Sequence, residues 1–415
     1  MCIVQKIDRE ISHILQCIQN NSEEMALNTQ IGLANIGNTC FLNVVLQALR
    51  LAPPIGELCL AKDLVLREGT RKGEFVRAFQ TLIRDLWQAN VPVGKQPTMI
   101  PRGFIHSLHC VLRETGDNWY RPGQQSDAAE ALQYILDSLH DGIYRKVKMD
   151  IVGTAGSSAE LSQVKAIQSW AEFHGKEYSP IIQNFYGQTQ MCVTCTQCGN
   201  VSERYEPWLM IKAPIPGADV VGGPAPDLTA CINSAFAPES IDDYDCSKCQ
   251  EKTKANMAGR LSRLPPITIV SLKRFTNAGH KVRGTIKWDL DHFDFSGVSA
   301  FDRDPFTDSR SPPIYETFAV IEHHGSTHGG HYRMFARQGD WTLYDDSSVQ
   351  KVTPDSVITA DSYVALMMPK EQCKAMNTRF ARNIIEARLA LIAASAPAPA
   401  PAPAPAVEEG KAAEA

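Results

Sequence analysis

The chain has 415 residues, of which 44% are hydrophobic and 21% charged, and its formal net charge is −5. This composition is typical of a soluble globular protein with one large or two ordinary domains, each able to bury a substantial core. The negative charge and the lack of a Lys/Arg-rich run argue against a nucleic-acid binder driven by overall charge. We find no charged-then-apolar signal sequence and no run of 18 apolar residues, so we expect neither secretion by that route nor a membrane span.

The N-terminal fifty residues predict two helices. Residues 1–30 carry isoleucine and leucine at amphipathic helical spacing, and the apolar face of that helix would pack on the rest of the protein or bind a partner. The stretch Gly32–Arg50 reads GLANIGNTCFLNVVLQALR, a glycine-containing loop followed by apolar residues at helical spacing. Asn38 and Thr39 are good N-cap residue types, so Cys40 should lie in the first helical turn. A thiol there feels the positive end of the helix dipole, which favours the nucleophilic thiolate, although a lone cysteine is more often a buried structural residue.

The rest of the chain changes from helical to strand patterns. Apolar stripes predict helices around Phe75–Leu86 and Ala128–Leu139, the second with Ser126 as a candidate cap, whereas the polar residues 150–179 predict a loop. Short runs rich in β-branched and aromatic residues then predict five strands. These are Thr268–Phe275, Phe318–His323, His331–Arg337, Trp341–Tyr344 and Tyr363–Met368. The pattern favours an α+β protein with its site between a helical and a strand-rich lobe.

Two CxxC pairs supply four soft ligands suited to a tetrahedral zinc ion. They are Cys195, Cys198, Cys246 and Cys249. The 47 residues between the pairs exceed the about 15–20 of a compact zinc ribbon. Cys192 also forms a CxxC with Cys195, but Gly199 after Cys198 suits a tight metal knuckle, which favours the set above. Four thiolates leave no open coordination position, so we expect one structural Zn²⁺ and no cofactor for catalysis. Cysteines arranged for metal binding rather than disulfides also predict a reducing intracellular compartment, cytoplasmic or nuclear.

The segment His323–Val349 reads HHGSTHGGHYRMFARQGDWTLYDDSSV. It offers four histidines to a distant thiol, and spacing alone does not choose among them. Asp345 and Asp346 follow two aromatic strand residues, and an Asp-Asp pair alone is more often a surface turn.

Five motifs together resemble the ubiquitin-specific protease family, which are papain-like deubiquitinating cysteine proteases. In chain order they are GLxNxGNTCFxN, the QxDAxE segment Gln125–Glu130, the two CxxC pairs, GGHY and WxxYDDSSV. The resemblance covers roughly Gly32–Pro369. It implies a papain-like fold with a thumb at about 31–180, zinc-ribbon fingers at about 181–265 and a palm at about 266–369. Beyond it, apolar spacing predicts one more helix over 370–395, and the Ala-Pro-rich tail 396–415 should be disordered.

The resemblance also implies the site residues. It makes Cys40 the nucleophile, His331 the base, Asp345 the group that orients the base, Asp346 its support and Asn35 the oxyanion donor. It places five residues along the cleft for the modifier's tail: Gln125, Asp127, Glu130, His323 and Tyr332. The implied activity is thiol-dependent hydrolysis after the C-terminal glycine of ubiquitin, with ubiquitin and ubiquitinated proteins as partners.

Two alternatives stay open. Ala129 and Ala131 stand where the family usually has larger residues, so a ubiquitin-like modifier is a possible substrate. A non-catalytic ubiquitin-binding scaffold is the other alternative, and the intact Cys40, His331 and Asp345 argue against it.

Overall fold

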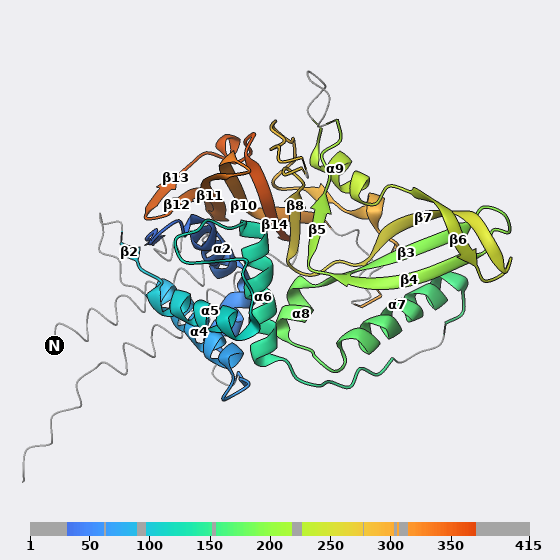
Figure 1. Cartoon of the computed structure of the whole chain (residues 1–415), viewed down its shortest axis with the longest axis horizontal. Coiled ribbons are helices and arrows are strands. Elements are labelled where there is room, and N and C mark those ends of the chain that lie inside the picture. The colour runs from blue at the N-terminus through green and yellow to red at the C-terminus, as the bar shows by residue number, and fades with distance from the viewer. Residues whose placement is uncertain are drawn as a thin grey trace, which may run out of the picture.

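The structure is a computed structural model of the chain. It describes residues 31–61, 64–88, 97–151, 155–217, 226–276, 278–302, 305–306 and 314–370. The helices predicted over 1–30 and 370–395 and the tail 396–415 lie outside the described residues, except for Lys370. The fold is α+β, as predicted, with a helical lobe, a large sheet and a projecting smaller sheet (Figure 1).

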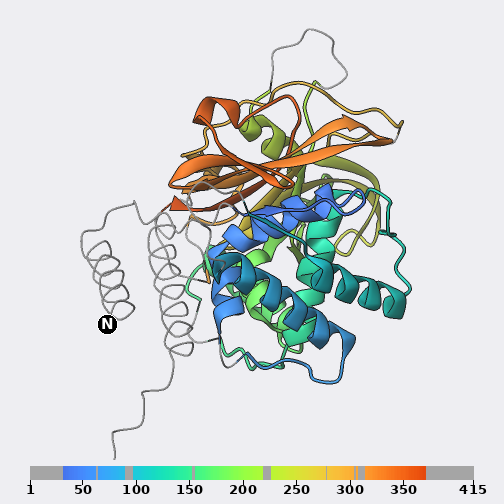
Figure 2. The same cartoon turned by 90° about the vertical axis from the view of Figure 1, so that its left-hand side faces the viewer.

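The helical lobe is built around a helix buried on every side. Its helices are α2 (Cys40–Leu51), α3 (Pro53–Leu60), α4 (Arg71–Gln88), α5 (Arg102–Thr115) and α6 (Ala128–Ile143). Every residue of α2 is buried, including the polar Gln47 and Arg50, because the helices α3 and α6 and the strands β11 (Gly329–Gln338) and β12 (Asp340–Asp345) of the large sheet pack against it. The two-residue strands β1 (Gly32–Leu33) and β2 (Thr98–Met99) pair in parallel beside it. Burial of α2 therefore fixes its N-terminus at the boundary between the two lobes (Figure 2).

The large sheet has eight strands. They are β5 (Met210–Ala213), β8 (Thr268–Leu272), β9 (Phe293–Asp294), β10 (Ile314–Ser326), β11 (Gly329–Gln338), β12 (Asp340–Asp345), β13 (Ser348–Lys351) and β14 (Ser362–Pro369). The order is β13-β12-β11-β10-β14-β8-β5, with β9 on β10, and all five predicted strands belong to it. Alternate side chains point to opposite faces, so Ile321 and Met334 pack on the helical lobe while Ala365 and Met367 pack on the helix α9 (Leu228–Ala235). The strand predicted to reach Phe275 ends at Leu272.

The smaller sheet projects to the right in Figure 1. It consists of β3 (Gly187–Cys195), β4 (Val201–Trp208), β6 (Glu239–Cys246) and β7 (Glu251–Arg263), in the order β4-β3-β7-β6. A short helix α8 (Pro180–Phe185) leads into it, and the 3₁₀ turns η1 (Ser296–Val298) and η2 (Pro354–Ser356) belong to the connections of the large sheet. No helix in the described part of the chain is long and apolar enough to span a membrane.

Two local predictions are wrong. Residues 150–179, predicted as a loop, contain the helix α7 (Ser158–His174), which begins with a capping box formed by Ser157 and Glu160. Its residues pack along β4, so tertiary contacts support a helix whose own apolar periodicity is weak. Ser126 does not cap α6: its hydroxyl donates to the Trp119 carbonyl, and Asp127 is the N-cap.

Candidate active site

Cys40 is the first residue of α2, with Thr39 as the N-cap, as predicted. The loop before it is shaped by its own polar groups. The Thr39 N–H donates to the Asn35 side-chain oxygen at 3.0 Å, and the Ile36 N–H donates to the Thr39 hydroxyl at 3.1 Å. The thiol is buried and lies at the N-terminus of a 12-residue helix.

His331 and Asp345 are hydrogen-bonded to each other between neighbouring strands. His331 lies near the start of β11 and Asp345 ends β12, and the imidazole Nε2 lies 2.6 Å from the Asp345 Oδ1. The glycine before the histidine is a steric requirement, because a Cβ on Gly330 would lie 2.1 Å from the His324 carbonyl oxygen. Strands β10 and β11 can therefore approach this closely only if residue 330 has no side chain. The close approach fixes the backbone from which His331 projects.

Gln125 connects the thiol to this histidine-bearing strand. Its side-chain Nε2 donates to Cys40 Sγ at 3.4 Å and to the Gly330 carbonyl, and its Oε1 accepts from the Gly330 N–H at 2.7 Å. The cysteine, the glutamine and the residue before His331 thus share one hydrogen-bonded group, drawn from α2, the loop before α6, and β11.

Asp346 has a different set of partners from Asp345. Its backbone turns into the left-handed region, with φ at 49°. Its carboxylate accepts from the Asn35 amide at 2.9 Å and from the Asn43 amide at 2.7 Å, and its carbonyl accepts from the Leu33 N–H at 2.8 Å. Asp346 therefore fixes both the loop before Cys40 and the first turn of α2. No role was predicted for Asn43, although it is the final asparagine of the GLxNxGNTCFxN motif.

Asp127 joins α6 to two tyrosines of the large sheet. While one oxygen of Asp127 caps α6, the other accepts from the Tyr363 hydroxyl at 2.8 Å and from the Tyr332 hydroxyl at 3.5 Å. Burial, followed by the Asp127 charge, raises the pKa of both tyrosines, so both stay protonated donors. Tyr363 was also missed, because it lies in a strand with no motif around it.

The two remaining predicted cleft residues differ in environment. His323 is buried, its ring lies 4.6 Å from that of Tyr332, and burial lowers its pKa to about 4, so its imidazole is neutral near pH 7. Glu130 is exposed on the first turn of α6. Burial and the charge of Asp127 raise the pKa of Glu130, while the nearby Lys212 ammonium partly offsets this.

The four cysteines of the two CxxC pairs come together at the far end of the smaller sheet. All four Sγ atoms lie within 4.8 Å of one another, with Cys195 and Cys249 at 3.9 Å and Cys198 and Cys246 at 3.6 Å. A tetrahedral ion with Zn–S bonds of about 2.3 Å requires sulfurs about 3.8 Å apart, so the cluster could hold a metal ion of that size.

Local structure supports this cluster. Cys192 lies outside it, since three residues along an extended strand place its side chain on the face opposite to that of Cys195. The Thr253 hydroxyl and then the backbone N–H of Cys198 lower the pKa of the Cys195 thiol to about 6. The Cys198 side chain and burial raise the pKa of the Cys249 thiol, so without a cation the four sulfurs do not titrate alike.

His331, Asp345 and Asp346 also bring ligand atoms within 4.8 Å of one another. Their polar atoms already have partners: Asp345 holds the imidazole, and Asp346 holds two amides. This arrangement suits a hydrogen-bonded catalytic group better than a metal site.

Comparison with known proteins decides the family. Residues 31–367 match the family model described as "Ubiquitin carboxyl-terminal hydrolase". The chain belongs to this family. Its similar relatives include ubiquitin carboxyl-terminal hydrolase 21 of Bos taurus and of Homo sapiens, each 30% identical over 367 residues that cover 83% of the chain and 62% of the relative. This member of the ubiquitin carboxyl-terminal hydrolase family therefore spans about three fifths of the length of these curated relatives.

Solved structures show the same fold. The SAGA Ubp8/Sgf11/Sus1/Sgf73 DUB module bound to ubiquitin aldehyde contains a chain that matches with a TM-score of 0.61 and 20% identity, covering 81% of this chain and 69% of that one. The module bound to monoubiquitin matches with the same TM-score and identity. The chain thus shares its fold with these solved structures.

Proposed function

We propose that the chain is a deubiquitinase that hydrolyses the isopeptide or peptide bond after the C-terminal glycine of ubiquitin. The observation that carries this is the convergence of Cys40 at a helix N-terminus with the Asp345–His331 pair, joined through Gln125. Family membership and the ubiquitin-bound neighbours agree with it. The free cysteines of the described residues fit a reducing compartment, the cytoplasm or nucleus.

In the proposed mechanism, the Cys40 thiolate attacks the carbonyl carbon of the terminal glycine. His331 then gives its proton to the leaving lysine amine, and the C–N bond breaks to leave a thioester on Cys40. A water molecule, losing a proton to His331, attacks the thioester and releases the free modifier. Asp345 keeps the imidazole oriented and stabilises its protonated form during both steps.

The negative oxygen of each tetrahedral intermediate requires donors in place before the reaction. We assign this role to the Asn35 amide and the Cys40 backbone N–H. One hydrogen of the Asn35 Nδ2 binds Asp346, and the amide oxygen accepts from Thr39, so the remaining hydrogen has a fixed direction. Asp346 thereby acts on the oxyanion site through Asn35 rather than on His331.

The cleft between α6 and the large sheet would hold the extended tail of the modifier. We assign the walls to Gln125, Asp127, Glu130, His323 and Tyr332, and add Tyr363. Because Asp127 already accepts two tyrosine hydroxyls and caps α6, its main contribution is a rigid, negatively charged wall. Exposed Glu130 is free to meet a basic residue of the tail.

The cysteine cluster would bind one structural zinc ion through Cys195, Cys198, Cys246 and Cys249. Zinc held by four thiolates has no open coordination position, so it contributes to folding and not to the reaction. These ligands lie at the end of the smaller sheet, away from α2 (Figure 1).

One experiment tests the activity and its substrate together. The wild-type protein and the Cys40→Ala variant are incubated with ubiquitin, and separately with ubiquitin-like modifiers, that carry a C-terminal electrophile. We expect a covalent adduct on Cys40 of the wild type with ubiquitin alone, located by mass spectrometry. If the protein reacted only with a ubiquitin-like modifier, that modifier and not ubiquitin would be its substrate. Absence of any adduct with an intact Cys40 would contradict the proposed activity.

A further inference from the structure

An arginine stands beside the His331–Asp345 pair on the large sheet. The register of β11 with β12 pairs Met334 with Tyr344, and the same register continued by one residue sets Arg333 opposite Asp345. Arg333 follows His331 by two residues, so the two side chains point to the same face of β11, about 7 Å apart along the strand. Side chains directly opposite each other on neighbouring strands are close enough to interact. The guanidinium is therefore within reach of the carboxylate that holds the imidazole.

Arg333 has a second acid on its other side. Glu322 on β10 is in register with Arg333 on β11. The guanidinium donates to the Glu322 Oε1 from Nε at 2.9 Å and from Nη2 at 2.5 Å. Within the residues that the structure describes, Arg333 forms no ion pair with Asp345. Three neighbouring strands thus carry a row of acid, cation and acid, the Glu322–Arg333–Asp345 row, in which the cation binds one acid only.

Burial decides which acid holds the arginine. The Glu322 side chain is 0% exposed, whereas that of Asp345 is 33% exposed. A carboxylate that lacks a cation is far more costly when buried than when water reaches it, and an ion pair is stronger where water is excluded. The other Glu322 oxygen accepts from the Thr359 hydroxyl at 2.7 Å, which fixes the direction of the carboxylate. Arg333 is therefore held on Glu322, and Asp345 is left to the imidazole.

Three more titratable groups border the row. The His324 Nε2 lies 2.6 Å from the Glu322 Oε1 and 2.8 Å from the Arg333 Nη2. Its Nδ1 lies 3.3 Å from an oxygen of Asp361, whose other oxygen accepts from the Lys281 ammonium at 2.6 Å. With a neutral His324, the two acids and two cations of this group balance. The arginine charge is therefore compensated without any contribution from the catalytic pair.

The row lies on the face of the sheet opposite to the cleft. Val320 and Phe335 continue the same face along β10 and β11, and they pack with Trp341 in an apolar cluster outside the main core. Tyr332 points to the other face, where its hydroxyl meets Asp127. A substitution at Glu322 or Arg333 therefore leaves the residues assigned to the cleft in place.

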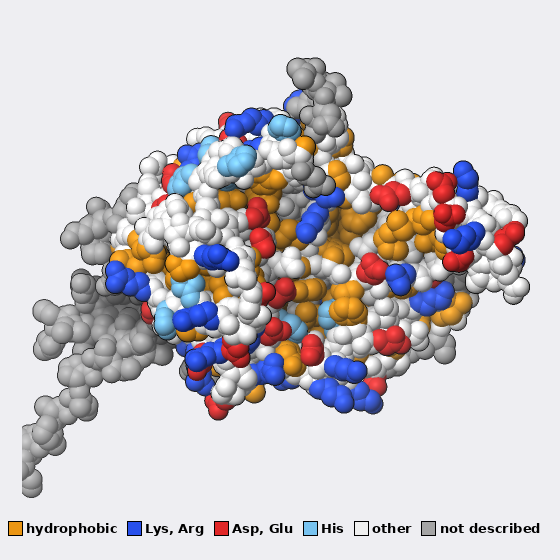
Figure 3. Space-filling model, in the orientation of Figure 1, with side chains coloured by type: hydrophobic (Ala, Val, Ile, Leu, Met, Phe, Trp, Pro, Cys, Tyr) orange, Lys and Arg blue, Asp and Glu red, His pale blue; other side chains and the backbone are white. Residues whose placement is uncertain are grey.

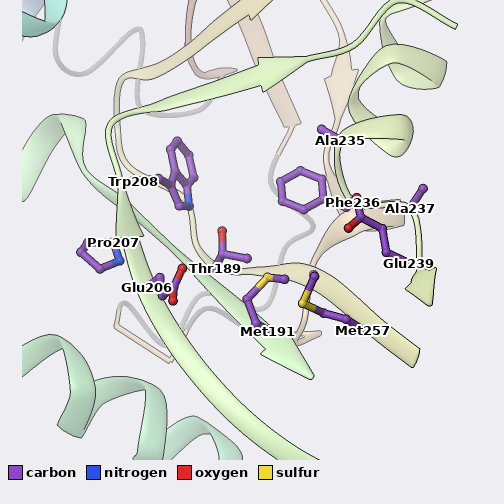
Figure 4. Close-up of a pocket in the computed structure, with 11 residues that line it drawn as sticks. Thr189, Met191, Glu206, Pro207, Trp208, Ala235, Phe236, Ala237, Glu239 and Met257 are labelled. Carbon is purple, nitrogen blue, oxygen red and sulfur yellow. The ribbon is translucent and has the colours of Figure 1, made fainter. Parts of the chain in front are cut away.

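Two apolar regions of the surface also lie elsewhere. Figure 3 shows apolar side chains gathered in the recessed middle of the molecule, between the helical lobe and the smaller sheet. A hollow of about 260 Å³ on the smaller sheet is lined by Trp208, Phe236 and Met257 among others, and by no residue of the row (Figure 4). We therefore expect the row to affect the chemical step and not substrate binding.

We propose that Glu322 is a positioning residue for the reaction: by binding Arg333, it keeps the guanidinium away from Asp345 and leaves Asp345 to orient His331. The proposal rests on the proposed function, since the orientation of His331 matters to the reaction only if this histidine is the base. Without the Glu322 charge, the arginine would turn to the acid on its other side. The Nε2–H of His331 would then lose its acceptor to a competing cation.

The test is a double-mutant cycle on Glu322 and Arg333. Glu322→Gln keeps the shape and removes the charge, so kcat for a fluorogenic ubiquitin amide should fall at least about tenfold, with KM within about twofold of the wild type. Adding Arg333→Gln removes the competing cation, and kcat should return to within about threefold of the wild type. Loss of a purely structural contact is not repaired by removing its partner. An unchanged kcat in Glu322→Gln, or no recovery in the double variant, would overturn the proposal.

A spectroscopic signature follows the same variants without substrate. A carboxylate only accepts hydrogen bonds, so His331 of the wild type should carry its proton on Nε2, which long-range ¹H–¹⁵N NMR of histidine-labelled protein detects. The His331 signals, assigned by their loss in His331→Ala, should change in Glu322→Gln and return in the double variant. If the wild type cleaves no ubiquitin substrate but the signals follow this course, the proposed function fails and the role of Glu322 stands. Unchanged signals in Glu322→Gln would mean that Arg333 does not disturb the pair.

Asp291→Asn is the matched control. It releases Arg337 from its ion pair on the same strand and the same face, but six residues and about 20 Å from His331. Both kcat and the His331 signals should stay as in the wild type. If Glu322→Gln does not fold, Glu322→Asp keeps the charge and withdraws it by one methylene. Its kcat should fall less, and Arg333→Gln should again restore it; failure to restore it would leave Glu322 a structural role only.

Discussion

The adjacent residues Asp345 and Asp346 have distinct structural tasks because the backbone changes direction between them. Asp345 still belongs to β12 and faces His331 on the neighbouring strand. Asp346 adopts a φ of 49°, which sends its carboxylate toward Asn35 and Asn43 instead. The family resemblance predicted Asp345 as the orienting group and Asp346 as its support, whereas the Asp-Asp pair by itself gave no reason for the two to differ.

The first prediction concerns orientation of the base. His331→Ala should lower kcat nearly as much as Cys40→Ala, because nucleophile and base act as a unit. Asp345→Asn keeps the shape but loses the charge that stabilises the imidazolium, so we expect a fall in kcat of about 10²–10⁴ with little change in KM. Steady-state kinetics on a ubiquitin amide measure both. A KM effect as large as the kcat effect would mean that Asp345 binds substrate.

The second prediction concerns Asp346. Asp346→Ala leaves the buried Asn43 amide and the Asn35 amide without their carboxylate, which should cost about 1–3 kcal/mol of unfolding free energy. Without Asp346 the Asn35 amide is no longer held toward the oxyanion, which should also lower kcat by about 10²–10³. Urea unfolding and kinetics report the two effects. If Asn35→Ala lowers kcat far less than Asp346→Ala does, then Asp346 acts by some route other than Asn35.

At the scale of elements, Asp127 joins the start of α6 to two strands of the large sheet. The third prediction is that Asp127→Ala should cost about 0.5–2 kcal/mol through the lost cap and also raise KM, since the Tyr332 and Tyr363 hydroxyls lose their acceptor. Thermal unfolding and kinetics measure these. Ser157→Ala on α7 is the matched control: it removes an N-cap far from the cleft and should lower stability without altering KM. If Asp127→Ala and Ser157→Ala have the same KM, Asp127 serves only as a helix cap and does not affect substrate binding.

The elements also show where sequence patterns succeed. Helix α2 and the five strands around His331 were predictable because their apolar residues follow the helical or alternating period. The helix α7 was not, because its polar face is broad and its stability depends on contacts with β4, which no local pattern reveals. Cap assignment at α6 failed for a similar reason: Ser126 and Asp127 are equally good caps, and only the distant Trp119 carbonyl engages Ser126.

The whole molecule should lose stability in mild acid through a histidine remote from the site. His174, on α7, is buried, and burial followed by the Arg263 charge lowers its pKa to about 4. Below its ordinary pKa of about 6.5 the unfolded chain takes up a proton that the folded chain refuses until pH is near 4, so stability falls as pH falls through this window.

The fourth prediction follows from this sign. His174→Phe removes the titrating group, so the loss of unfolding free energy between pH 7 and pH 5 should be smaller than in the wild type by up to about 2 kcal/mol. Urea midpoints at the two pH values, with equal slopes, measure the difference. The same pH dependence in both proteins would show that His174 is protonated in the folded state.

The last prediction concerns the two ends of the molecule. The smaller sheet extends away from the helical lobe, and the four cysteines come together at its far end, so the free energy of metal binding there should contribute to folding that sheet. Cys246→Ser should lose about one zinc per chain by elemental analysis, become sensitive to proteases around residues 190–250, and bind ubiquitin more weakly. Its Cys40 should still react with a small alkylating agent at the wild-type rate, because α2 and the large sheet do not depend on the cluster. Cys192→Ser, which lies outside the cluster, should keep its zinc. Zinc retained by Cys246→Ser, or lost by Cys192→Ser, would require a different ligand set.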